Sequence, residues 1–170
     1  MDTKTQARQR AVAPRATPAP RPAPPRPRTA APHRVVPAAP DLPSLTHRLL
    51  PQAVRNTMAT LGWWQNPIPQ KPSTHLEQTI AVLTRYGWGR SLDFSPTGRM
   101  CIRGAQTLLE TTGHVTAHHR ARAIGYMQTV LAEHGVTMPY FAWNDLPDQQ
   151  FSRVEDLLHT SARTARQNGE

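Results

Sequence analysis

Apolar side chains recur at the period of an α-helix through the second half of the chain. The first run of this kind begins near Ser73 and ends at Gly87. Its apolar positions, spaced by four, three and three residues, are Leu76, Ile80, Leu83 and Tyr86. Thr74, followed three residues later by Glu77, is typical of a capping box at a helix start. The pattern predicts an amphipathic helix over about 73–86.

Three further stripes predict three more helices. The second helix stops at Gly113, and the third is expected to begin at Thr116 and to end at Gly135. The apolar faces are formed by Cys101, Ala105, Leu108 and Leu109, by Ile124, Met127, Val130 and Leu131, and by Phe151, Val154, Leu157 and Leu158. The connection 88–100 is a long loop, and the segment VTMPYFAWNDLP at 136–147 is typical of an extended or looped chain.

These elements predict a mostly α fold. Residues 73–165 are expected to form a small bundle of about four helices with one long loop, around a single core. Residues 44–72 are expected to hold one short helix, from about Pro51 to Leu61, and then a linker punctuated by prolines. Residues 166–170 have little apolar content and are expected to fray.

The first 43 residues have a different composition. Eleven of the 18 prolines lie between Pro14 and Pro43, and almost no apolar side chain larger than valine occurs there. Proline fixes its own φ and pushes the preceding residue towards extended geometry. Too little apolar surface is present for burial to offset the entropy of ordering the chain. Residues 1–43 are therefore predicted to be a disordered tail with polyproline II character.

The same tail holds most of the positive charge. It carries eight basic and two acidic residues, a net charge of +6, whereas residues 44–170 carry 12 basic and nine acidic residues, a net charge of +3. The arginines of the tail are Arg8, Arg10, Arg15, Arg21, Arg26, Arg28 and Arg34. Short cationic segments bind nucleic acid through phosphates, with little specificity and a strong dependence on salt. We expect these arginines to contact nucleic acid. Two alternatives stay open: PAPPRPR docks as a proline-rich peptide, or the tail has no specific role and reflects a genome rich in G and C.

A second group of arginines lies within the predicted helical domain. Its members are Arg90, Arg99, Arg103, Arg120 and Arg122. Together they are a candidate patch for phosphate. No recognition-helix motif, zinc finger or RNA-binding signature accompanies them.

Composition also limits the compartment and the cofactors. Cys101 is the single cysteine, so an intramolecular disulfide and a Cys-rich zinc site are excluded. No apolar run approaches the ~20 residues of a membrane span, and no apolar segment follows the basic N-terminus as it would in a signal peptide. The cytoplasm is the default expectation, with no membrane partner and no cofactor. His114 and His118 have the spacing of two zinc ligands on one helix face. A helix that begins at Thr116 would contain only His118, so the two would not share a face and no metal is expected.

One arrangement of residues is compatible with thiol chemistry. Cys101, a histidine and Asn144 follow one another in the chain order of some thiol proteases, where histidine deprotonates the sulfur and asparagine orients the imidazole. The candidate histidines are His114, His118, His119 and His134. Against this interpretation, a free cysteine on the apolar face of a helix usually acts as a small buried apolar residue.

Trp143, Asn144 and Asp145 stand together before the last helix. The structural interpretation is that Asn144 or Asp145 caps the first amides of that helix, while Trp143 buries its ring against the first apolar stripe. The alternative is that these residues contact a ligand. In that case the pocket is expected between them and the 88–100 loop.

Several of these residues form a pattern that runs from Gly87-Trp88, through Cys101-x-x-Gly104-Ala105 and Trp143-Asn144-Asp145, to Val154-x-x-Leu157-Leu158. It resembles a family of small domains of unknown function from actinobacteria and their phages and mobile elements, over about 75–165. The resemblance implies a shared fold and no particular activity. Where that family has a threonine at the start of the last helix, this chain has Asp148-Gln149-Gln150, so Asp148 is expected to cap the helix instead.

We therefore expect a non-enzymatic interaction or regulatory protein whose basic arm contacts nucleic acid. A protein is a second candidate partner. The alternative is a small enzyme that uses Cys101 or Asp145 beside the 88–100 loop.

Overall fold

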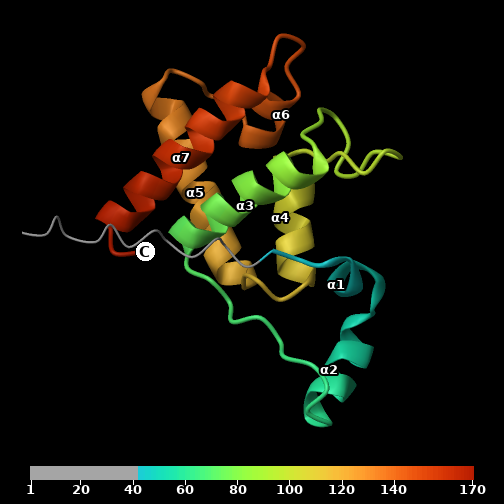
Figure 1. Ribbon diagram of the computed structural model, residues 1–170. Helices are drawn as coiled ribbons and strands as arrows, with labels where there is room; N and C mark the ends of the chain where they lie inside the picture. The colour runs from blue at the N-terminus through green and yellow to red at the C-terminus, as the bar shows by residue number, and fades with distance from the viewer. Residues whose placement is uncertain (1–41) are drawn as a thin grey trace, which may run out of the picture. The chain divides into compact units, whose positions relative to one another are not determined.

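The computed structural model describes residues 42–170, and this part of the chain is mostly helical (Figure 1). It contains α1 (Leu45–Leu49), α2 (Gln52–Thr60), α3 (Pro72–Tyr86), α4 (Ile102–Thr111), α5 (Ala117–Glu133), α6 (Tyr140–Asn144) and α7 (Phe151–Gln167). Between residues 42 and 170 the only extended pairing is a single bridge that joins Trp88 and Met100. The prediction of a mostly α fold is confirmed. Within the same range, no helix is both long enough and apolar enough to cross a bilayer.

The predicted tail and its seven arginines, from Arg8 to Arg34, lie outside the described residues, apart from Leu42 and Pro43 at the very end of the tail. Leu42 packs at the edge of the core, and the carbonyl of Pro43 accepts a hydrogen bond from the Tyr86 hydroxyl at 2.9 Å. Leu42 and Pro43 are therefore part of the folded domain.

The core lies among the four longest helices. Helix α3 packs against α7, α4 and α5, and α5 packs against α7. The apolar stripes predicted from the sequence supply many of its fully buried side chains, among them Leu76, Leu83, Leu109, Met127 and Leu158. Burying a side chain of this size contributes about 1.5–3 kcal/mol relative to leaving it in water, so these contacts hold the helices together.

Two helix ends follow the predicted signals. The Thr116 hydroxyl accepts a hydrogen bond from the backbone N–H of His119, as expected for the residue that caps α5. Gly87 follows α3 with a φ of 91°, a conformation that glycine adopts without a steric penalty. The predicted capping box at Thr74 is wrong. Helix α3 begins at Pro72, after Lys71, because a proline in the first turn has no backbone N–H that needs a partner.

Other boundaries differ from the prediction. The segment expected to be extended contains α6, which begins after Pro139. Asp148 does not cap α7, because the capping position is Gln150 and no side chain bonds there. Asp148 instead forms an exposed ion pair with Arg153 at 3.6 Å. Beyond the predicted end of the domain, α7 continues to Gln167.

The last residues, expected to fray, are held against α5. The carboxylate of Glu170 pairs with Arg122 at 3.1 Å and accepts a hydrogen bond from the Tyr126 hydroxyl at 3.0 Å. Both partners lie on α5.

The short helix α2 is attached to the end of α4 by polar contacts. Arg55 is the buried residue of α2, and its guanidinium donates to the carbonyls of Thr111 and Thr112 at 2.7 and 3.1 Å. These carbonyls are at the C-terminal end of α4, where a positive charge is favourable. Trp63, just after α2, is 74% exposed.

Candidate functional site

The loop between α3 and α4 closes on itself at its base. The backbone N–H of Gly89 donates to the Met100 carbonyl at 2.9 Å, and that of Met100 donates to the Gly87 carbonyl at 3.1 Å. Met100 is fully buried. The two ends of the loop are therefore fixed together beneath residues 90–99. Figure 1 shows this loop and α6 at the same end of α3 and α4.

Gly104 lets the loop lie directly on α4. A Cβ atom at this position would stand 1.9 Å from the carbonyl oxygen of Asp93 and 2.7 Å from its carbon. No side chain fits in that space, so glycine is required where the loop crosses the first turn of α4. This contact explains the glycine of the Cys101-x-x-Gly104 pattern.

Cys101 belongs to the same contact. It is the residue that precedes α4 rather than a member of the helix, and it is 5% exposed. Its thiol donates to Asp93 Oδ1 at 3.3 Å, and Arg103 Nε donates to the same oxygen at 2.7 Å. Asp93 is thus the central acceptor, a role that was not predicted from the sequence.

Trp88, Asn144 and Asp145 form a chain of hydrogen bonds between the loop and the end of α6. The indole N–H of Trp88 donates to Asn144 Oδ1 at 2.9 Å, and Asn144 Nδ2 donates to Asp145 Oδ1 at 2.8 Å. The same carboxylate oxygen accepts the backbone N–H of Ser91 at 2.8 Å, and Ser91 has a φ of 68°. Asparagine and aspartate therefore fasten the loop, and the prediction that they cap α7 is wrong.

Trp143 lies apart from this chain of bonds. Its half-buried ring lines a groove of about 230 Å³ with Leu131 of α5 and Leu157 of α7. Trp143 also packs at the edge of the core as a partly buried side chain, so the burial expected for its ring is only partial.

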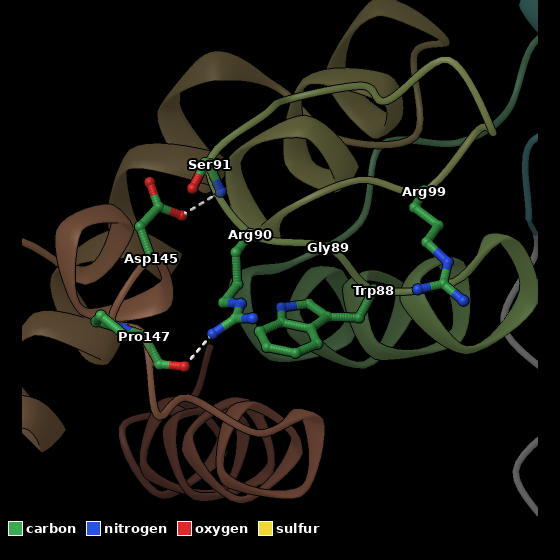
Figure 2. Close-up of a pocket in the computed structure, with 7 residues that line it drawn as sticks. All are labelled: Trp88, Gly89, Arg90, Ser91, Arg99, Asp145 and Pro147. Atoms are coloured by element: carbon green, nitrogen blue, oxygen red, sulfur yellow. Dashed lines mark hydrogen bonds between the residues drawn. The ribbon is translucent and has the colours of Figure 1, made fainter.

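A pocket lies between the loop and Asp145, the place expected for one (Figure 2). It has a volume of about 670 Å³ and is lined by Trp88, Gly89, Arg90, Ser91, Arg99, Asp145 and Pro147. Arg90 donates to the carbonyls of Leu146 and Pro147. Arg99 is exposed and, in the part of the chain that the structure describes, its side chain forms no hydrogen bond or ion pair.

Residues 67–164, more than half of the sequence, match DUF6197, a family of unknown function. The chain belongs to the DUF6197 family. The match begins in the linker before α3 and ends within α7, so the DUF6197 domain includes the loop, α6 and the pocket. No curated protein and no solved structure matches the chain. Membership in a family of unknown function, expected from the resemblance, is confirmed.

The candidate histidines of the DUF6197 domain bond elsewhere. His119 Nδ1 lies 2.9 Å from the Gln70 carbonyl, and His134 Nδ1 lies 2.8 Å from the Val130 carbonyl. His114 is buried beside the Thr112 hydroxyl at 2.8 Å, and His118 is exposed. Within residues 42–170, the Cys101 thiol bonds to Asp93 and to no histidine. In the same range, no three His, Cys, Asp or Glu side chains are grouped so as to hold a metal ion.

The Cys101 thiol of the DUF6197 domain is held in its neutral form. Burial raises its pKa above the ordinary value, and the hydrogen bond to the Asp93 carboxylate raises it further. The thiolate is the nucleophilic form, so this environment does not activate the sulfur.

We expect iodoacetamide to alkylate Cys101 more slowly in the native protein than in the protein unfolded in urea, across pH 7–9. The native rate should rise with pH without reaching a plateau in this range, because the raised pKa keeps the thiolate fraction small. Mass spectrometry of quenched samples measures both rates. Native alkylation faster than that of the unfolded chain would show an activated thiol instead.

Proposed function

We propose that this protein is a non-enzymatic interaction or regulatory protein in which the DUF6197 domain carries a basic arm that contacts nucleic acid. A non-enzymatic domain is supported by the hydrogen bonds that its polar motif residues already make within the fold. Cys101, Asn144 and Asp145 each bond to the 87–101 loop or to one another. Groups that are engaged in this way position a loop and do not form a nucleophile–base pair.

The charge of the arm is the reason to propose that it contacts nucleic acid. Residues 1–43 carry eight basic residues against two acidic ones, and prolines separate several of the arginines. Proline favours extended geometry, which spaces positive charges along a strand of phosphates. Binding of this kind is driven by release of counterions and therefore weakens steeply as salt is added.

A full-length variant tests this proposal. In this variant, glutamine replaces each of the seven arginines that lie between Arg8 and Arg34. The net charge of the arm changes from +6 to −1. We expect affinity for a labelled short DNA or RNA, measured by fluorescence anisotropy, to fall by about tenfold or more at 50 mM salt. The binding that the wild type shows at this salt concentration should be largely lost by about 200 mM.

The matched control changes the same seven arginines to lysine. This variant keeps the charge of +6, so it should retain nearly all of the affinity if phosphate neutralisation drives binding. Equal affinities of the glutamine variant and the wild type would exclude the arm as the contact.

A further inference from the structure

We propose that the pocket between the 87–101 loop and Asp145 binds the phosphate of a nucleotide, with Arg99 and Arg90 as its cationic side and the indole of Trp88 as its aromatic side. This site lies within the folded domain, so the inference goes beyond the function proposed for the arm and does not depend on it.

Charge is the first argument. Of the five arginines predicted to form a phosphate patch, three are neutralised by carboxylates: Arg103 by Asp93, Arg120 by Glu110, and Arg122 by Glu170. The remaining two, Arg90 and Arg99, both line the pocket. A guanidinium suits phosphate because its fixed donors match two phosphate oxygens at once.

The two remaining arginines are not equivalent. Arg90 donates to the carbonyls of Leu146 and Pro147, which orient the guanidinium and leave its charge uncompensated. Arg99 is exposed and, within residues 42–170, has no polar partner for its side chain. Its donors are therefore available for an incoming anion, and Arg99 is the main phosphate contact.

Asp145 is the carboxylate that lines the pocket, and it offsets only one of the two positive charges. Its Oδ1 already accepts hydrogen bonds from the Ser91 backbone and from the Asn144 side chain. With two guanidinium groups and one carboxylate, the lining residues carry a net positive charge. The other carboxylate oxygen of Asp145 remains as an acceptor for a hydroxyl or amino group of a nucleoside.

Trp88 supplies a fixed aromatic surface. Its ring stacks on Phe151 with 6.2 Å between ring centres, and its N–H is held by Asn144. Figure 2 shows Trp88 between Arg90 and Arg99. Bases stack on aromatic side chains, and a ring that is already ordered loses little entropy on binding. The pocket, about 670 Å³ in volume, is open to solvent and therefore accessible to a nucleotide.

Titration calorimetry on the full chain tests the site with adenosine monophosphate, inorganic phosphate and a short oligothymidylate. Arg99→Gln should weaken binding of adenosine monophosphate by about tenfold or more, because a charge-assisted hydrogen bond is lost. Arg163→Gln, a change of another exposed arginine without a polar partner among residues 42–170, should alter the affinity by less than about twofold. Equal melting temperatures establish that both variants fold.

Oligothymidylate is titrated into the chain whose seven arm arginines are glutamine, so that the arm does not contribute. Binding that depends on Arg99 identifies the source of the phosphate. The source is a free nucleotide if only adenosine monophosphate binds, and a nucleic-acid strand if the oligothymidylate binds. The proposal is overturned if neither adenosine monophosphate nor oligothymidylate binds saturably, or if Arg99→Gln and Arg163→Gln have the same affinity. It is also overturned if inorganic phosphate binds as tightly as adenosine monophosphate.

Discussion

Replacing Gly104 with alanine is expected to lower the free energy of unfolding by about 1–3 kcal/mol or more. The new methyl group would stand 1.9 Å from the carbonyl oxygen of Asp93. That oxygen belongs to the backbone of the loop, so a side-chain rotation cannot relieve the overlap. The loop has to move away from α4, and the bonds from Cys101 and Arg103 to Asp93 are lost with it. Urea denaturation measures the change.

Gly125→Ala is the matched control. Gly125 lies within α5, and a Cβ atom there would meet nothing within 4 Å. Because alanine favours the helix, this variant should be more stable than the wild type by about 0.5–1 kcal/mol. The same methyl group should therefore have opposite effects at the two positions. A Gly104→Ala protein as stable as the wild type would mean that the loop does not rest on α4.

The long helices could be predicted because each repeats its apolar stripe over several turns. Leu76 and Leu83 in α3, and Leu157 and Leu158 in α7, lie in the core as their spacing indicates. Helix α6 has five residues, from Tyr140 to Asn144, and such a short segment cannot repeat a period of 3.6. Helix α1, also five residues long, was missed for the same reason.

The site could be located from the sequence, but its contacts could not. The long loop and the Trp-Asn-Asp segment were named as the place where a pocket would lie, and the pocket found there is lined by the loop and by Asp145. The rules for capping consider only near neighbours in the chain, so they assigned Asn144 and Asp145 to α7. Their actual partners, Trp88 and Ser91, are 56 and 54 residues away. Likewise, the need for Gly104 depends on where an irregular loop places the Asp93 carbonyl.

Asn144→Ala is expected to lower the free energy of unfolding by about 1–3 kcal/mol. Asn144 is 1% exposed and joins Trp88 to Asp145. Its removal leaves the half-buried indole N–H of Trp88 without this acceptor, and Asp145 loses one donor. Asp145→Ala should cost less, about 0.5–1.5 kcal/mol, because Asp145 is exposed and water can replace its bonds. Denaturant titrations of both variants give the comparison.

A double-mutant cycle with Trp88→Phe isolates the bond between the indole and Asn144. Phenylalanine keeps an aromatic ring against Phe151 but has no N–H, so in this background Asn144→Ala removes no acceptor that a donor needs. The cost of Asn144→Ala should then be smaller by about 0.5–1.5 kcal/mol than in the wild type. Equal costs in the two backgrounds would show that this bond adds nothing to stability. The loop would then depend for its position on the contacts of Gly104 and Asp93 and on the bond from Ser91 to Asp145.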